Sequence, residues 1–518
     1  MSAGTELGAA RIPRAPAATA LVKARRLTTA AVAVAALVPL AAYLWVAAHD
    51  LGYPYELDWM EGGSVGLAGR VLSGHSLYVA PSLRFVGWAY PPLYYWLAAA
   101  VAKLTGLGFL PLRLVSAGSA LAAMATLAWI VLRDTRDRLA ALVAAGLFAA
   151  TYRLSGAWFD VGRVDSLFLA LTLVAMAWGC RARGVRGGAV LGLLTFLAFF
   201  TKQTALVAIA PALAYLIVTR RRVGVTAVIT AVVLVLGSTL LLDALTAGWY
   251  RYYAFSELAG QPWMSQLWVG FWGRDVLAHQ WPLALLLALA FASWARERAK
   301  PRVGWPAGYW LAAAAGLLGA AWVSRLHTGG YLNVLMPTYA ATALLAGLAL
   351  ASVRRRGGAT AALAGALVIA QVAILGSWLG TEVPSARDRA AGAALLARLR
   401  RLPGPVLVLR HPWYATELGK GTFAQDEAIG DVLRSEARRG ARALRASLAT
   451  ALDVDRVRAV VLDGGFDAEL LGGELQAQFR LQPQPLTRSP LYPLTDTQTA
   501  PRLLYLRIRP PGRRAPRS

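Results

Sequence analysis

The sequence predicts a helical protein that crosses a membrane many times and ends in a small α/β domain. Hydrophobic residues make up 57% of the 518 residues and charged residues only 15%, whereas about a quarter of a soluble domain is charged. The apolar residues form long runs between residues 27 and 379, and a spanning helix needs about 20 of them. Beyond residue 381 the runs become short and strand-like, which predicts a separate folded unit.

The apolar runs predict about eleven membrane-spanning helices. They lie near residues 27–48, 112–132, 138–153, 164–180, 187–201, 204–218, 223–243, 279–295, 305–323, 331–350 and 358–378. Basic clusters between the runs test this number of helices, because cytoplasmic loops are rich in Lys and Arg. The clusters are the N-terminal arm and the segments 133–138, 181–186, 220–222, 296–302 and 354–356. Eleven spans and a cytoplasmic N-terminus place all six clusters in the cytoplasm.

One stretch requires a choice between one helix and two. A single helix over residues 187–218 would be about 48 Å long, well beyond the roughly 30 Å apolar core of a bilayer. It would also put Arg186 and Arg220 on opposite sides. Two short helices joined near Thr201–Thr204 avoid both conflicts and place Lys202 at the outer face.

This topology divides the chain into four parts. They are a cytoplasmic basic arm (1–26), a membrane domain (27–380) with a long first outer loop (49–111), an extracytoplasmic α/β domain (381–509) and a disordered tail (510–518). Within the loop, residues 93–104 predict a helix lying in the membrane interface. In the α/β domain we expect strands at 406–409, 457–462 and 503–508, and helices at 424–433 and 437–448.

Composition also excludes some classes of protein. The net charge of +26 does not indicate nucleic-acid binding, because the basic residues cluster in loops and form no stripe with interleaved aromatic residues. The single cysteine, Cys180, excludes an intrachain disulfide.

Ionisable side chains gather at the outer ends of the predicted helices, where they are costly unless they have a role. The first outer loop contributes Glu56, Asp58 and Glu61, and the next contributes Asp160, Arg163 and Asp165. Lys202 and the pair His327 and Tyr331 follow from two further segments. Structural alternatives exist for each: a solvated loop, a helix cap at Asp165, or a lysine that reaches the headgroups. Convergence from four segments nevertheless predicts a site.

Several short motifs carry a family resemblance. They are Asp58-Trp59-Met60-Glu61-Gly62, Arg70-Val71-Leu72-Ser73-Gly74-His75-Ser76-Leu77-Tyr78, Tyr90-Pro91-Pro92-Leu93, Arg163-Val164-Asp165-Ser166-Leu167, Phe200-Thr201-Lys202, and Gly330-Tyr331 with Pro337. In this order the chain resembles the polytopic C-type glycosyltransferases that use polyprenyl-phosphate sugars, which include the protein O-mannosyltransferases (the dolichyl-phosphate-mannose-protein mannosyltransferase superfamily) and the lipid A aminoarabinose transferases. Tyr90 stands where some members have Lys or His.

The resemblance implies a membrane glycosyltransferase of the cell envelope, in the plasma (inner) membrane, with its site on the extracytoplasmic face. Asp58, Glu61 and Asp165 would be catalytic, with Asp58 or Glu61 as general base. Lys202, Arg163 and Tyr90 would bind the donor phosphate. Glu56, Asp160, His327 and Tyr331 are further candidates for the cavity. The partners would be a polyprenyl-phosphate sugar, membrane lipids and a lipid, glycan or protein acceptor, without nucleic acid.

Other functions stay open at this point. A multi-spanning transporter or lipid flippase would place acids near the membrane midplane on broken helices, and a non-catalytic receptor would use only the outer domain. Acidic pairs can hold a divalent cation, so metal use is undecided.

Overall fold

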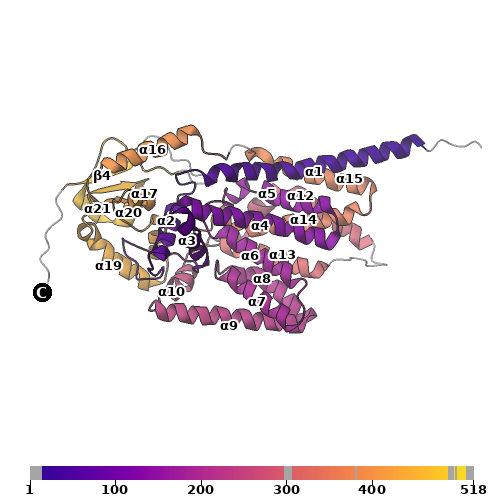
Figure 1. The fold of residues 1–518 in the computed structure, drawn as a ribbon, viewed down its shortest axis with the longest axis horizontal. Helices are drawn as coiled ribbons and strands as arrows, with labels where there is room; N and C mark the ends of the chain where they lie inside the picture. Colours follow the sequence, from indigo (N-terminus) through magenta and orange to yellow (C-terminus); the bar gives the residue numbers. More distant parts are fainter. Residues whose placement is uncertain (1–14, 297–305, 380–381, 488–494, 496–498, 509–518) are drawn as a thin grey trace, which may run out of the picture.

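Long helices run side by side along the longest axis of the molecule, and an α/β domain covers one end of them (Figure 1). The computed structural model describes residues 1–518 except 1–14, 297–305, 380–381, 488–494, 496–498 and 509–518. We call the end of the helical domain that meets the α/β domain the covered end, and the opposite end the far end.

Eleven helices overlap the eleven predicted spans one for one. They are α1 (Ala15–Leu51), α4 (Phe109–Thr135), α5 (Arg138–Ala150), α6 (Asp165–Gly179), α7 (Gly184–Phe199), α8 (Ala205–Thr219), α9 (Arg221–Leu245), α12 (Ala278–Arg296), α13 (Ala307–Arg325), α14 (Met336–Arg354) and α15 (Gly358–Leu375). In the described residues, seven spans are long and apolar enough to cross a membrane, while α5, α6, α7 and α8 are apolar but shorter. The polytopic helical fold is therefore confirmed, and the number of crossings stays a prediction.

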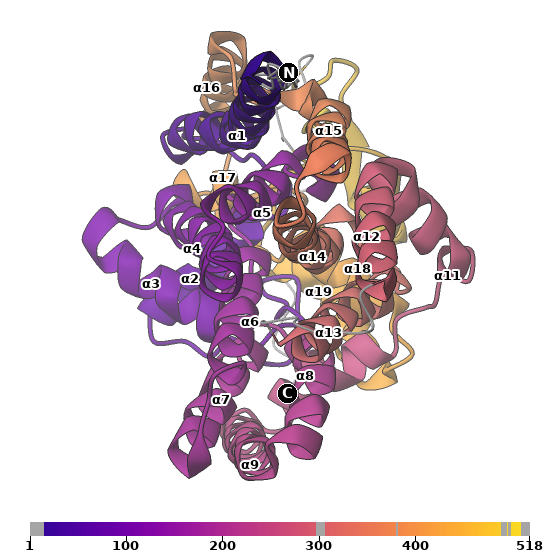
Figure 2. The ribbon, with the colours of Figure 1, turned by 90° about the vertical axis from the view of Figure 1, so that its right-hand side faces the viewer.

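The helices pack around α14, which contacts α4, α5, α12, α13 and α15. Viewed along the bundle, α1 and α15 lie on one flank and α7 and α9 on the opposite flank (Figure 2). Small residues let the backbones approach closely. A Cβ added at Gly146 of α5 would lie 2.3 Å from the carbonyl oxygen of Ala36 in α1, so this contact requires glycine.

The covered end carries the shorter helices. They are α2 (Glu61–Leu72), α3 (Leu93–Thr105), η1 (Arg153–Ser155), α10 (Trp249–Arg251), η2 (Tyr252–Glu257), α11 (Leu267–Gly270), η3 (Phe271–Leu277), η4 (Leu332–Leu335) and η5 (Gly376–Trp378). Residues 93–104, expected as an interfacial helix, lie in α3; their position relative to a membrane stays a prediction. Between Phe199 and Ala205 the chain turns, so residues 187–218 form two helices as expected.

The C-terminal domain contains a four-stranded sheet in the order β1-β2-β4-β3. Its strands are β1 (Val406–Val408), β2 (Ala459–Leu462), β3 (Phe479–Leu481) and β4 (Leu503–Arg507). Strand β1 is parallel to β2, and β4 is antiparallel to both β2 and β3. Its helices are α16 (Ala386–Arg401), α17 (Pro412–Glu417), α18 (Asp426–Arg434), α19 (Arg438–Val454), α20 (Gly465–Leu471) and α21 (Gly473–Gln478).

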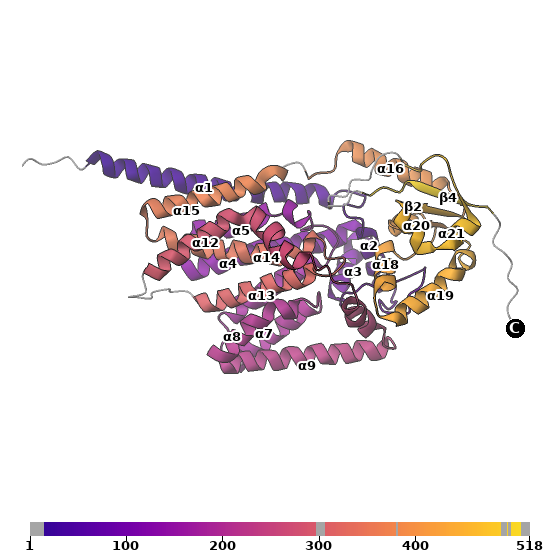
Figure 3. The same ribbon diagram turned by 180° about the vertical axis from the view of Figure 1, so that it is seen from behind.

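The α/β character of this domain is confirmed, and the sequence patterns missed β3, α16, α17, α20 and α21. Figure 3 shows its sheet beyond the covered end, with α18 turned toward the helical domain. Residues 510–518, expected to be disordered, lie outside the described residues. In the basic arm, helix α1 already begins at Ala15.

Candidate functional site

A cavity of about 190 Å³ lies between the covered end and the C-terminal domain. Its walls come from six parts of the chain: residues 60 and 87–90 of the first outer loop, 163, 202–204, 257–261, 323–334, and 427–431 of α18. Five of the candidate residues from the sequence analysis line it: Tyr90, Arg163, Lys202, His327 and Tyr331. Asp58, Glu61, Asp165, Glu56 and Asp160 are not among its lining residues.

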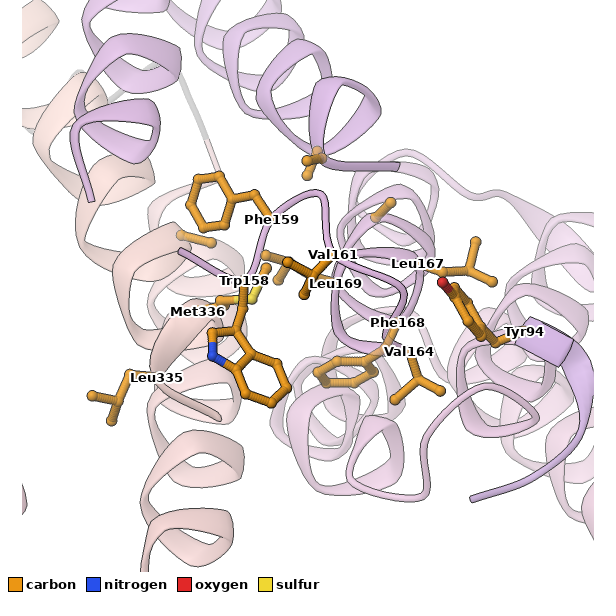
Figure 4. Close-up of a cluster of buried hydrophobic side chains, with 14 of the residues drawn as sticks. Tyr94, Trp158, Phe159, Val161, Val164, Leu167, Phe168, Leu169, Leu335 and Met336 are labelled. Carbon is orange, nitrogen blue, oxygen red and sulfur yellow. The ribbon is translucent and has the colours of Figure 1, made fainter. Parts of the chain in front are cut away.

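A buried hydrophobic cluster fixes the segment that enters α6. Trp158, Phe159 and Val161 point from this segment into a cluster with Phe168 of α6 and Met336 of α14 (Figure 4), and all five side chains are buried. The burial of these large side chains stabilises the segment by several kcal/mol, at about 1.5–3 kcal/mol for each. Arg163 and Asp165 are therefore held in place, because buried residues precede them and follow them in the chain.

Asp165 and Lys202 form a buried ion pair. The Lys202 Nζ donates to Asp165 Oδ1 at 2.6 Å, and the side chains are only 8% and 2% exposed. Asp165 is the first residue of α6 rather than its cap, because the cap residue is Val164. Its charge lies where a helix favours an anion. Lys202 is directed into the protein and does not extend toward lipid headgroups in this structure.

Arg163 is a buried cation that lies mainly among aromatic rings. Its residue is 4% exposed, one Nη donates to the sulfur of Met60 at 3.0 Å, and its Nε has no hydrogen-bond partner. Aromatic rings surround the guanidinium, with the ring centres of Trp88, Trp158 and Tyr90 at 4.8, 5.0 and 5.8 Å. No ion pair of Arg163 occurs among the described residues. A buried guanidinium with free donors in a cavity wall can bind an anion.

Arg113 is also buried, but all of its guanidinium nitrogens donate hydrogen bonds within the protein. It donates to both carboxylate oxygens of Glu61 at 2.9 and 2.6 Å. It also donates to the carbonyl oxygens of Asp50, Tyr53 and Tyr55 at 2.6–2.8 Å. The sequence analysis missed Arg113, although an arginine inside a predicted span is itself a signal.

Glu61 accepts two further hydrogen bonds, from the backbone N–H groups of Leu57 at 2.8 Å and Gly162 at 2.7 Å. Both oxygens are therefore occupied, and the side chain is 1% exposed. The Glu61 carboxylate ties the first outer loop to α4 and to the segment before α6.

Asp58 does not line the cavity itself but is hydrogen-bonded to Met60, which does. Its carboxylate accepts from the backbone N–H of Met60 at 3.1 Å and from the Thr495 hydroxyl at 2.9 Å. The residue is fully buried. Burial raises the pKa of Asp58 to about 7, although the positive charge of Arg163 opposes the shift. A carboxylate with a pKa near neutrality is suited to accept a proton.

The remaining acidic candidates contact other parts of the protein. Glu56 pairs with His411 of the C-terminal domain, and His411 also bonds Asp463 at 3.1 Å. Asp160 accepts from the hydroxyl of Tyr152 at 3.1 Å. Glu56 therefore joins the first outer loop to the C-terminal domain, and Asp160 joins the segment before α6 to the end of α5.

The structure adds a wall that the sequence analysis missed. Glu257, Gln261, Glu427 and Asp431 line the cavity. Gln261 donates to Glu257 at 2.6 Å and to the carbonyl oxygen of Asp431 at 2.8 Å, while its own Oε1 has no partner. Burial raises the pKa of Glu257 to about 7. Arg434 pairs with Glu427 and Asp431, so three carboxylates face one guanidinium in this wall. The i, i+4 spacing of Glu427 and Asp431, which places them on one face of α18, was the available signal.

In the part of the chain that the structure describes, no group of three or more His, Cys, Asp or Glu side chains is arranged as a metal site. The described residues therefore offer no candidate ligand set for a divalent cation.

Comparisons with known proteins bear on the fold and on part of the sequence. The model of the dolichyl-phosphate-mannose-protein mannosyltransferase family matches residues 89–242. That range contains Tyr90, Arg163, Asp165 and Lys202, whereas Asp58 and Glu61 precede it. No curated protein matches the chain in sequence.

Two solved structures of ArnT show the same fold over nearly the whole chain. The crystal structure of ArnT from Cupriavidus metallidurans bound to undecaprenyl phosphate is 15% identical, with a TM-score of 0.58 over 91% of this chain and 97% of that one. The apo state of the same protein gives a TM-score of 0.57 at 15% identity, over 90% and 97%. The oligosaccharyltransferase of Archaeoglobus fulgidus, with Zn and sulfate, is 11% identical, with a TM-score of 0.49 over 84% and 68%. The resemblance and fold class expected from the sequence are thus confirmed.

Proposed function

We propose that this integral membrane protein is a glycosyltransferase that moves a sugar from a polyprenyl-phosphate donor to an acceptor hydroxyl. The observation that carries the proposal is Arg163, a buried guanidinium with a free Nε and no carboxylate partner in the described chain, in a cavity wall. The family match over residues 89–242 and the fold shared with ArnT bound to undecaprenyl phosphate support a lipid-linked phosphate as the anion.

Donor binding follows from the charges around this wall. The phosphate of the donor would contact Arg163, where a charge-assisted bond in a partly dry site is worth about 1.5–3 kcal/mol. Lys202 lies near this wall, with its Nζ 5.7 Å from the ring centre of Tyr90, but Asp165 balances its charge at 2.6 Å, so it would add little to donor binding. The polyprenyl chain would extend along the outside of the helices into lipid.

The chemical step transfers one proton and breaks one bond. We assign Asp58 as the base, because the oxygens of Glu61 are already occupied by four donors. The acceptor hydroxyl gives its proton to Asp58, its oxygen bonds to the anomeric carbon, and the bond from that carbon to the phosphate oxygen breaks. The phosphate leaves with the electron pair, and Arg163 stabilises its charge. Movement of Met60 would bring Asp58 into contact with the acceptor.

The opposite wall favours an acceptor without negative charge. Three carboxylates, those of Glu257, Glu427 and Asp431, face the single guanidinium of Arg434 in this wall. Burial raises the pKa of Glu257 to about 7 and raises that of Asp431 above its ordinary value, so an anionic acceptor would be repelled only by the carboxylates that remain ionised beyond the one that Arg434 neutralises. Hydroxyl groups can donate to the carboxylates and to the free Oε1 of Gln261. We therefore propose a neutral hydroxyl-bearing acceptor, such as a glycan. Transfer to neutral and to phosphorylated or carboxylated acceptors would be compared in the parent and in Glu427→Gln, and a preference for anionic acceptors in the parent contradicts this assignment.

The orientation is also a proposal. Six basic clusters on one side of the predicted topology support a cytoplasmic far end and a cavity on the extracytoplasmic face of the plasma membrane. Cysteines introduced at Ser385 and Arg221 should be labelled from opposite sides of the membrane. Labelling of both from the same side contradicts the topology.

The experiment that tests the function is a screen of the purified full chain against several polyprenyl-phosphate sugars. It would measure release of the lipid phosphate in the presence of glycan acceptors. We expect release with at least one donor, and a loss of about ten- to a hundredfold in Arg163→Gln. Arg251→Gln is the matched control, because Arg251 is exposed and outside this cavity. If Arg163→Gln binds every donor as tightly as the parent does, Arg163 is not the anion site.

A further inference from the structure

Five arginines gather in a second hollow, at the far end of the helical domain. Arg133, Arg136, Arg181, Arg183 and Arg220 line a cavity of about 980 Å³ together with Leu132 and Cys180. They come from three successive turns, α4–α5, α6–α7 and α8–α9. Because α4 and α6 begin near Arg113 and Asp165, their other ends place this hollow away from the candidate active site.

Two of the five arginines are fixed by the protein. Arg220 donates to the carbonyl oxygens of Ala182 and Cys180 at 3.2 and 2.7 Å, which satisfies carbonyl groups beyond the C-terminal end of α6. Arg181 pairs with Asp134, whose other oxygen accepts from Trp310 at 2.6 Å. The Nε of Arg181 is buried and has no hydrogen-bond partner, so a donor of this fixed cation remains unused.

The other three arginines are available. Arg133, Arg136 and Arg183 are exposed, and none of them forms an ion pair with a residue that the structure describes. Among the described residues, Asp134 is the carboxylate that pairs with a lining arginine, and Asp137 of the same turn pairs with Arg354 instead. Arginines repel one another at short range, and a bound polyanion or phosphate would relieve this repulsion through bidentate contacts.

The border of the hollow is apolar. The ring of Trp129 lies below both Arg133 and Arg181, at 5.6 and 5.8 Å from its centre. Trp129 is 44% exposed and Leu132 is 40% exposed. An indole ring at a helix end is typical of the headgroup level of a membrane. A phosphate next to an apolar surface at that level is the chemistry of a phospholipid.

We propose that this hollow, formed by Arg133, Arg136, Arg181, Arg183 and Arg220, binds the phosphate headgroup of an anionic phospholipid, with the acyl chains along Trp129 and Leu132. The general enrichment of cytoplasmic loops in basic residues does not explain why these five arginines line one hollow. The neighbouring residues Arg221 and Arg222 are also basic and lie at the same end, but they do not line the hollow. The site is independent of the proposed transferase activity and would anchor the far end to one lipid class.

The test is binding of phosphatidylglycerol to the full-length protein in detergent, followed by native mass spectrometry. The cavity variant is Arg133→Gln/Arg136→Gln/Arg183→Gln, and the matched control is Arg186→Gln/Arg221→Gln/Arg222→Gln, which removes three exposed charges at the same end. An arginine near anionic lipid contributes about fivefold in affinity. We expect the cavity variant to bind at least about tenfold more weakly and the control to stay within about threefold of the parent.

Three outcomes overturn the proposal. Equal weakening of both variants shows general attraction by a basic surface, and equal binding of phosphatidylcholine shows that the headgroup charge is not recognised. Displacement of the lipid by inorganic phosphate at the same concentration shows a free-anion site. If the triple variant does not fold, the three single variants decide the question, each with an expected loss of about fivefold.

Discussion

Arg113 and Arg163 are both buried at the covered end, yet their surroundings differ completely. Arg113 makes five hydrogen bonds, two of them to Glu61 and three to backbone carbonyl groups. Arg163 donates to one sulfur atom, has a free Nε and lies between aromatic rings in a cavity wall. A satisfied buried charge holds a fold together, whereas one with free donors can bind an anion.

The same distinction separates the acidic residues. Glu61 is occupied by Arg113 and by two backbone donors, while Asp58 has two donors and a raised pKa. The two carboxylates are three positions apart in one motif, and the sequence offered either as the base. Their partners now favour Asp58 for proton transfer and Glu61 for support.

The largest expected effect is on stability, at Arg113. Replacing it by Met leaves Glu61 as an uncompensated buried charge, which costs about 3–5 kcal/mol. We expect a large fall in the melting temperature of the purified protein, or no folded protein at all. Arg163→Gln is the comparison, because it removes no ion pair, and its melting temperature should change much less. Similar losses in the two variants would mean that Arg163 is also structural.

The next effect is on turnover, at Asp58. Asp58→Asn removes the base, and such groups contribute about 10²–10⁴-fold to rate. Donor binding should remain, because Asp58 does not line the cavity itself. In the parent, turnover should rise with pH through about 7, since burial raises the pKa of Asp58 to about 7 and only the deprotonated form accepts a proton. A parent profile that is flat from pH 5 to 9 contradicts this role.

The features that could be predicted from the sequence are those determined by neighbouring residues in the chain. The eleven helices follow from apolar runs, and Arg163, Asp165 and Lys202 were found because they stand out at the ends of such runs. Their partners were not predictable in the same way. Thr495 reaches Asp58 across 437 positions, and α18 supplies a cavity wall from a separate domain. Contacts of this kind depend on tertiary packing, which no local pattern encodes.

An intermediate effect is expected for donor affinity at Arg163. Arg163→Gln should weaken binding of the polyprenyl-phosphate donor by about ten- to a hundredfold, because a charge-assisted contact contributes about 1.5–3 kcal/mol. Arg163→Lys should recover only part of this, since an ammonium group does not reproduce the planar fork of arginine. Titration with a short-chain polyprenyl phosphate measures both. Unchanged affinity in both variants would remove Arg163 from the site.

The smallest effect is expected where a cation already has its partner. Lys202 is neutralised by Asp165 at 2.6 Å, so Lys202→Gln alone would leave a buried carboxylate beside the donor phosphate and weaken binding by repulsion. The double variant Asp165→Asn/Lys202→Gln removes both charges and leaves the net charge of the site unchanged. We therefore expect the double variant to bind the donor within about threefold of the parent, while the single variant loses about tenfold, the effect of one unpaired charge in a partly dry site. The same titration used for Arg163 measures the coupling. A double variant as weak as Arg163→Gln would show that Lys202 binds the phosphate directly despite its partner, and the distinction between paired and unpaired cations would then fail at this cavity.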